Sequence, residues 1–168
     1  MDHRIQTTFI ALGSSIGDGA AQLRQAVKLL ETIASGPIAC SSLWQTEPFE
    51  MQASDWFSNA VVSFNTSLSA AELLGSLKDI ERQSGRPTNH GVNTPRTLDL
   101  DIIGLGDEVI CSEDLTIPHP KASQRLFVLL PLAEIAPDFR FPKSNESLAT
   151  LIAQAPALEV IKTTLLEV

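Results

Sequence analysis

The 168-residue sequence has no tyrosine, only two cysteines and no excess of basic residues: 12 Lys and Arg against 20 Asp and Glu give a net charge of -8. This acidic balance argues against nucleic acid as the main partner, because a phosphate backbone selects a basic surface. Cys40 and Cys111 are too few and too far apart for a disulfide framework or a zinc motif. We therefore expect two reduced thiols in a cytoplasmic protein. With no export signal and no long apolar run, we expect no membrane partner.

The common phosphate-binding and nucleophile motifs are also absent. Gly13 to Gly17 is not followed by Gly-Lys-Ser/Thr, so it is not a Walker loop, and Gly17-Asp18-Gly19 lacks the third glycine of a dinucleotide fingerprint. No Ser/His/Asp or Cys/His arrangement stands out, which leaves a covalent mechanism without support. A nucleotide site in this chain would have to be built from other residues.

Hydrophobic periodicity predicts one domain over residues 1–168. Asp18 is the expected N-cap of a first helix, and Ser69 with Glu72 forms the capping box of a second helix that ends at Gly85. The expected strands are 7–12, 37–46, 57–66 and 97–105, the expected loops include 47–56 and 86–95, and short helices are expected at 127–136, with Pro131 in the first turn, and 148–152. This order predicts an α+β, ferredoxin-like βαββαβ core with C-terminal additions. Its mainly antiparallel sheet would carry both long helices on one face and leave the other face free for a site.

The most informative local feature is Asp99-Leu100-Asp101 inside an apolar strand. Residues i and i+2 of a strand point to the same face, so the two carboxylates project together and repel each other unless a cation lies between them. Taken alone, two solvated aspartates are the commoner explanation. Magnesium ions on phosphate oxygens would also fit. The potential cations and donors that flank this pair, Arg86, Arg96, His119 and Arg125, favour polyphosphate transfer.

A second group consists of aromatic and amide residues: Thr46, Phe49, Phe57, Asn59 and Phe127. Phenylalanines are usually core residues, which is the default explanation for each one alone. Two rings could instead clamp a flat heterocycle, each contributing about 1 kcal/mol beyond area burial. The amide of Asn59 carries both donor and acceptor groups and could recognise an aminopyrimidinone edge.

Several motifs follow one another along residues 8–142: Ala11-Leu-Gly-Ser-Ser-Ile-Gly-Asp18, Ser42-Leu-Trp-Gln-Thr-Glu-Pro48, Phe57-Ser-Asn-Ala-Val61, Ile80-Glu81, Gly85-Arg86, Pro95-Arg-Thr-Leu-Asp-Leu-Asp-Ile102, Ile117-Pro-His-Pro120, Arg125-Leu-Phe-Val-Leu129 and Pro131-Leu-Ala-Glu-Ile-Ala-Pro137. Together they resemble the 6-hydroxymethyl-7,8-dihydropterin pyrophosphokinase family. The segment from Pro95 to Ile102, followed by Pro-His-Pro and Arg-x-Phe-Val-Leu, is highly specific.

The resemblance implies an ATP-dependent transfer of pyrophosphate to 6-hydroxymethyl-7,8-dihydropterin in folate biosynthesis. The pterin oxygen attacks the β-phosphorus directly, giving AMP and the pterin diphosphate. Asp99 and Asp101 would hold two Mg²⁺ ions, and Arg86 and Arg96 would neutralise the transferred group. The implied nucleotide site is Glu81, Arg86, Arg96, Ile102, Thr116, His119 and Arg125. The implied pterin site is Thr46, Phe49, Phe57, Asn59, Asp99 and Phe127, with Phe57 and Phe127 on either side of the ring. We expect a monomer whose partners are these small molecules.

The chain departs from the family pattern mainly in the loop after Gly85. Thr88, Val92, Asn93 and Thr94 stand where an arginine, a basic residue, an aromatic residue and a glycine are usual, and Ser15 replaces an asparagine. Each lost auxiliary cation would slow turnover by a factor on the order of 10 to 10². We expect an active enzyme and keep two alternatives: a paralogue that binds ATP or pterin without efficient turnover, and a ferredoxin-like regulatory module that binds no ATP.

Overall fold

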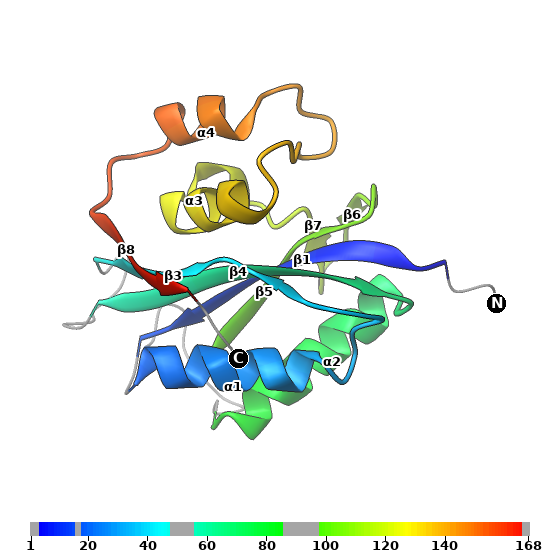
Figure 1. Cartoon of the computed structure of the whole chain (residues 1–168). Helices are drawn as coiled ribbons and strands as arrows, with labels where there is room; N and C mark the ends of the chain where they lie inside the picture. The colour runs from blue at the N-terminus through cyan, green and yellow to red at the C-terminus, as the bar shows by residue number, and fades with distance from the viewer. Residues whose placement is uncertain (1–3, 16–17, 48–55, 86–97, 166–168) are drawn as a thin grey trace.

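The computed structural model describes residues 4–15, 18–47, 56–85 and 98–165 (Figure 1). The elements follow one another as β1 (Gln6–Ser14), α1 (Gly19–Leu30), β2 (Ala39–Cys40), β3 (Ser42–Thr46), β4 (Phe57–Thr66), α2 (Ala70–Gln83), β5 (Asp99–Leu105), β6 (Ile110–Cys111), β7 (Thr116–Ile117), the 3₁₀ turn η1 (Ala122–Gln124), α3 (Leu126–Ile135), α4 (Leu148–Gln154) and β8 (Val160–Leu165). No helix in these ranges is both long enough and apolar enough to cross a membrane.

The main sheet follows the order β5-β1-β4-β3-β8, and the short β2 also pairs with β4. The pairings between its described strands are antiparallel. Strands β5, β1, β4 and β3, with a helix after β1 and another after β4, form the βαββαβ arrangement of a ferredoxin-like fold, so the predicted fold class is confirmed. A separate hairpin of β6 and β7 lies beside β5.

Helices α1 and α2 lie on one face of this sheet (Figure 1). Both predicted starts are confirmed: the Asp18 carboxylate accepts a hydrogen bond from Ala21 N–H, and Ser69 and Glu72 form a reciprocal capping box. The buried leucines of the two helices pack against the inward-facing residues of β1 and β4. This core includes Leu23, Leu30, Leu73, Leu77, Ile10, Leu12, Val62 and Phe64. Burying each such side chain contributes about 1.5–3 kcal/mol.

Helices α3 and α4 cover part of the opposite face (Figure 1). A second apolar cluster lies beneath them and includes Val61, Ile103, Leu129, Leu132 and Leu148. The sequence prediction left this face free for a site. It is only partly free, because the C-terminal helices pack over strand residues such as Val61 and Ile103. These residues alternate along the strands with Val62 and Ile102 of the first core.

The predicted place of Pro131 in the first turn of its helix is wrong. Helix α3 begins at Leu126 and contains Pro131 in its interior. Val128 and Leu129 N–H both donate to the Arg125 carbonyl, so the first turn is complete before the proline. Proline has no N–H to donate to the carbonyl four residues earlier, that of Phe127. The side chain of Pro131 is buried, and this burial offsets the missing hydrogen bond.

The predicted strand over residues 37–46 is divided in two at Ser41. The backbone N–H of Ser41 donates to the Val61 carbonyl, while its hydroxyl accepts from Val61 N–H. This side-chain bond interrupts the ladder with β4 at the point where β2 ends and β3 begins. The C-terminal strand β8 was not predicted, and it extends the sheet by pairing with β3.

Candidate active site

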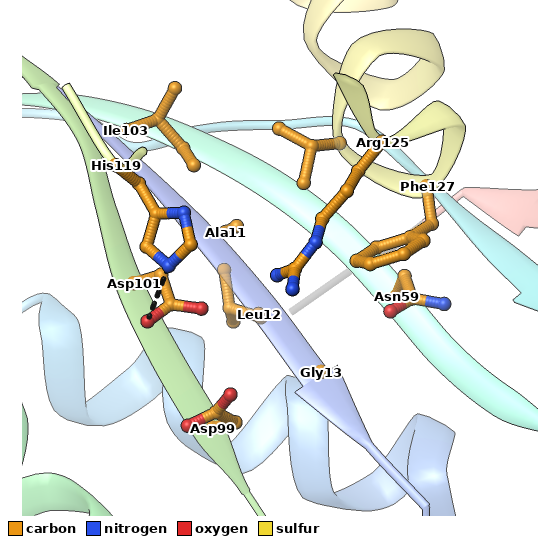
Figure 2. A pocket seen from close by; sticks show the side chains of 11 residues that line it. Ala11, Leu12, Gly13, Asn59, Asp99, Asp101, Ile103, His119, Arg125 and Phe127 are labelled. Carbon is orange, nitrogen blue, oxygen red and sulfur yellow. Dashed lines mark ion pairs between the residues drawn. The ribbon is translucent and has the colours of Figure 1, made fainter. Parts of the chain in front are cut away.

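Asp99 and Asp101 lie on β5 and point to the partly open face of the sheet (Figure 2). Leu100 and Ile102, which alternate with them, are buried in the core under α1 and α2. The prediction that the two carboxylates share one face is therefore confirmed. Both are half-exposed and line one pocket, together with Ala11, Leu12, Gly13, Asn59, Ile103, His119, Arg125, Phe127 and Val128.

His119 approaches the carboxylate pair from the segment after β7. Its Nε2 lies 3.9 Å from Asp101 Oδ1, while its Nδ1 accepts a hydrogen bond from Lys121 N–H at 3.3 Å. Burial and the nearby Arg125 guanidinium lower the pKa of His119 below its ordinary value, although Asp99 acts in the opposite direction. The neutral form is thus favoured, with its proton on Nε2 facing the carboxylate.

Arg125 comes from the residue that immediately precedes α3. Figure 2 shows its guanidinium directed into the pocket between His119 and Phe127. The guanidinium carbon lies 5.4 Å from the centre of the Phe127 ring, within the range of a cation–π interaction. Arg125 Nε is buried and has no hydrogen-bond partner among the described residues. A buried N–H without a partner is costly, so this donor fits a site that receives an anionic ligand.

The pocket's other side is formed by amide and aromatic groups. Asn59 Nδ2 donates to Thr46 Oγ1 at 2.9 Å, and both side chains are buried. Phe127 lies beside Asn59 in Figure 2. Phe57 is half-buried on β4 and pairs with Thr46 in the ladder between β3 and β4. The structure therefore brings Thr46, Asn59 and Phe127 together, with Phe57 at the edge of the group.

Three other predicted site residues lie outside this pocket. Glu81 is buried on α2, and its carboxylate accepts a hydrogen bond from the Leu100 N–H at 2.8 Å. The Ile102 side chain belongs to the core on the helix face, so only its backbone could contact a ligand on the site face. Thr116 is half-buried on the hairpin strand β7. Arg86, Arg96 and Phe49, like the departures at Thr88, Val92, Asn93 and Thr94, lie outside the described residues.

The donor set fits the implied magnesium ions. Two half-exposed carboxylates provide hard oxygen ligands at the mouth of a pocket, and Mg²⁺ commonly takes one or two carboxylates and completes its shell with water and substrate phosphates. The described residues contain no group of three or more His, Cys, Asp or Glu side chains placed to hold a metal by themselves. Asp99 and Asp101 would therefore hold an ion together with a phosphorylated ligand.

Sequence reasoning missed the residues that form the floor of the pocket. Gly13 pairs with Asn59 on one side and with Asp99 on the other, so it lies between the two halves of the site. A Cβ atom added to Gly13 would lie 3.5 Å from Asn59 Oδ1. Ala11 and Ile103 complete the same layer. The sequence showed that Ala11 and Gly13 are on the same face of their strand, but their position beside Asp99 depends on the order of the strands in the sheet.

The sequence profile of the family described as 7,8-dihydro-6-hydroxymethylpterin-pyrophosphokinase (HPPK) matches residues 9–137. A Bacillus subtilis protein named 2-amino-4-hydroxy-6-hydroxymethyldihydropteridine pyrophosphokinase is 45% identical over 128 residues, which cover 76% of this chain and 76% of that protein. A Haemophilus influenzae protein of the same name is 37% identical over 157 residues, covering 93% of this chain and 97% of that protein. Sequence similarity to these enzymes thus extends over most of the chain.

Solved structures show the same fold at low sequence identity. The wild-type Plasmodium falciparum HPPK-DHPS chain with SDX-DHP superposes with a TM-score of 0.71 at 14% identity, covering 90% of this chain and 44% of that chain. Its structure with STZ-DHP gives a TM-score of 0.72 at 15% identity and covers 90% of this chain and 43% of that one. The chain spans less than half the length of these solved proteins. From the profile match and the similarity to these bacterial proteins, this chain belongs to the 7,8-dihydro-6-hydroxymethylpterin-pyrophosphokinase family.

Proposed function

We propose that this chain transfers pyrophosphate from ATP to 6-hydroxymethyl-7,8-dihydropterin and releases AMP. The observation that carries the proposal is the division of one pocket into two chemically different halves (Figure 2). One half has paired carboxylates beside a histidine and an arginine, which suits a polyphosphate with its metal ions. The other half has a buried amide and an aromatic ring, which suits a flat heterocycle with donors along one edge.

Asp99 and Asp101 are proposed as the protein ligands of two Mg²⁺ ions. When bound, these ions would neutralise phosphate charge and polarise the transferred group. The carboxylates point the same way from adjacent same-face positions of one strand, so the backbone holds them in place before any ligand arrives. Such preorganisation lowers the reorganisation that phosphoryl transfer requires.

Arg125 and His119 are proposed to bind the nucleotide phosphates. The unpartnered Nε–H of Arg125 would gain a charge-assisted hydrogen bond that the described protein groups do not provide. His119 would donate from Nε2 as a neutral imidazole. Arg86 and Arg96 are proposed to add positive charge on the transferred group, as the family resemblance implies.

Asn59 and Phe127 are proposed to orient the pterin. Because the Asn59 amide nitrogen already donates to Thr46, its Oδ1 is left to accept hydrogen bonds from the amino and ring N–H groups of the pterin. Phe127 offers a ring face for stacking, and Phe57 and Phe49 are proposed as further aromatic contacts. Two substrates held side by side react as if in one molecule, which is the main advantage available without a covalent intermediate.

In the proposed reaction the hydroxymethyl oxygen of the pterin forms a bond to the β-phosphorus of ATP. The bond between that phosphorus and the oxygen bridging to the α-phosphate breaks in line with the attack. The hydroxyl proton is lost to solvent or to a phosphate oxygen, and AMP leaves with the electron pair. No side chain of the chain becomes covalently modified, in agreement with the lack of a nucleophile motif.

The test is AMP release from ATP, measured with Mg²⁺ and 6-hydroxymethyl-7,8-dihydropterin together and with each omitted in turn. We expect AMP only in the complete mixture. AMP formation that ignores the pterin would overturn the proposal. Binding of both ligands without AMP would identify the chain as a paralogue that has lost turnover, and binding of neither would leave the regulatory module.

A further inference from the structure

Glu134 lies near the C-terminal end of α3, and its carboxylate joins three elements of the chain. Its Oε1 accepts hydrogen bonds from Ser42 N–H at 3.0 Å and from the Ser42 hydroxyl at 2.5 Å, and lies 3.4 Å from Lys162 Nζ. Its Oε2 accepts from the Trp44 indole Nε1–H at 3.2 Å. One side chain of α3 is therefore fixed to β3 through three hydrogen bonds and to β8 through an ion pair.

The position requires a carboxylate. Three N–H or O–H donors converge on two oxygens, and an ionised carboxyl group accepts at both. Burial alone would raise the pKa of Glu134, but the hydrogen bonds from Ser42 and Trp44 and the charge of Lys162 outweigh it and lower the pKa below its ordinary value. A glutamine of the same shape would place its amide N–H₂ against one of these donors.

The two elements joined by Glu134 carry or adjoin different parts of the candidate pterin site. Helix α3 carries Phe127 and follows directly on Arg125. Strand β3 ends at Thr46, which accepts the hydrogen bond from Asn59, and Trp44 pairs with Asn59 in the ladder. Glu134 is about two helical turns from Phe127. Its hydrogen bonds and ion pair within the described residues go to Ser42, Trp44 and Lys162, so it fixes the helix that carries Phe127 to the strand that ends at Thr46.

We propose that Glu134 is a positioning residue for the pterin: by tying α3 to β3, it sets the distance between Phe127, which stacks on the ring, and the Thr46–Asn59 pair, which binds the edge of the ring. This inference rests on the proposed function, since it concerns the pterin half of that site. A ring that stacks on Phe127 and is hydrogen-bonded at its edge by Asn59 is sensitive to the distance between these residues, because stacking contacts and hydrogen bonds weaken over a fraction of an ångström. The proposed metal ligands depend much less on Glu134, because Asp99 and Asp101 are carried by β5, at the opposite edge of the sheet from β8. Among the nucleotide groups in the described part of the chain, Arg125 alone adjoins α3.

The experiment compares Glu134→Gln with wild type in the AMP-release assay, well below the unfolding temperature of each. Because the glutamine amide opposes one of the donors on β3, α3 should shift relative to β3, and we expect the KM for the pterin to rise by about tenfold. The KM for ATP should rise clearly less than the KM for the pterin, because Asp99, Asp101 and His119 lie on neither α3 nor β3. Glu146→Gln, at an exposed glutamate before α4, is the matched control and should change neither constant.

A second variant identifies the contact responsible. Trp44→Phe removes the indole N–H that faces Glu134 Oε2 and should raise the KM for the pterin by about threefold, since one hydrogen bond of three is lost. In the Glu134→Gln background the same change removes a donor that opposes the new amide. The double variant should therefore be no worse than Glu134→Gln alone, a non-additivity that a general loss of packing would not produce.

The outcomes distinguish a failure of the proposed function from a failure of the positioning role of Glu134. Wild-type protein that releases no AMP and binds no pterin overturns the proposed function, and the positioning role with it. An active wild type whose pterin KM is unchanged in both Glu134→Gln and Trp44→Phe overturns only the positioning role. Equal rises in both KM values, or a lower amount of active protein with unchanged KM values, would also overturn it, because either result indicates a purely structural contact.

Discussion

The two faces of the main sheet are made from alternate residues of the same strands, yet they are packed differently. On the face under α1 and α2, buried apolar side chains such as Leu12, Val62 and Leu100 form one continuous core. On the opposite face, the apolar cluster under α3 and α4 gives way, along the same strands, to Asn59 and the carboxylates of β5. The period of two allows one strand to contribute to stability on one side and to chemistry on the other. Substitutions of the buried apolar residues should therefore lower the free energy of unfolding, whereas substitutions of the polar pocket residues should lower activity.

The largest effect is expected from Asp101→Ala on the site face. Removing one of two proposed metal ligands should lower turnover by at least about 10³, because phosphoryl transfer depends on charge neutralisation. The fold should persist, since Asp101 is half-exposed on the site face and belongs to neither apolar cluster. AMP release and the thermal midpoint Tm would be measured together. Asp107→Ala, at an exposed turn after β5, is the control and should retain wild-type turnover. Wild-type turnover in Asp101→Ala would exclude the proposed metal site.

The converse result is expected from Leu73→Ala on the helix face. Leu73 is fully buried on α2, so its truncation leaves a cavity and should lower the free energy of unfolding by about 2–5 kcal/mol. The KM values of the remaining folded protein should not change. Chemical denaturation would measure the loss, and Leu74→Ala, at the half-exposed neighbour, should cost clearly less. A large change in pterin affinity without destabilisation would contradict the separation of the two faces.

A smaller and more selective effect is expected from Phe127→Ala. Loss of a stacking ring should raise the KM for the pterin by about tenfold with little change in the unfolding free energy. Phe139→Ala provides the comparison on the same side of the sheet. Its ring packs edge-on against Phe9 and Phe141, with centroids 4.9 and 5.0 Å away, and should affect stability instead of affinity. Kinetics with each substrate varied in turn would distinguish them, and identical behaviour of the two variants would argue against a role for Phe127 in binding.

The smallest effect concerns pH. The folded-state pKa of Glu134 lies below its unfolded value, so its contribution to stability is complete above the unfolded pKa and is lost as the pH falls through the folded pKa. The Tm difference between wild type and Glu134→Gln should therefore be constant near neutral pH and shrink below about pH 4.5. Thermal unfolding from pH 7 to pH 3 would measure it. A difference that grows in acid would mean that the pKa is raised instead.

The regular core could be predicted from the sequence because local signals there agree with the tertiary structure. Strand β4 coincides with its prediction, and the caps at Asp18 and Ser69 begin the helices as expected. Pro131 was misplaced because local propensity favours the first turn, whereas the burial of α3 against the sheet decided its position. Strand β8 could not be found because its pairing depends on the free edge of β3, more than a hundred residues earlier in the chain.

The candidate site, too, could be predicted from the sequence only in part. The Asp99–Asp101 pair follows from strand alternation alone, and its shared face is confirmed. The approach of His119 and Arg125 could be suspected only from residue type, since their contacts depend on how the chain returns over the sheet after β7. Glu134 lay within a motif that pointed to the family, but its role was invisible because its partners Ser42, Trp44 and Lys162 are distant in sequence.

The central position of Gly13 has a consequence for the size of substrate that the sheet can accept. Asn59 and Asp99 both pair with Gly13, so they stand in one row with a single strand between them. Hydrogen bonding fixes the spacing of neighbouring strands, which sets their Cα atoms about 10 Å apart. This row therefore fixes the distance between Asn59, the proposed pterin-binding group, and Asp99, the proposed metal ligand. A substrate with a different distance between its ring and its reacting group could not be accommodated by moving the strands. It would have to bind to a different row of residues across the sheet.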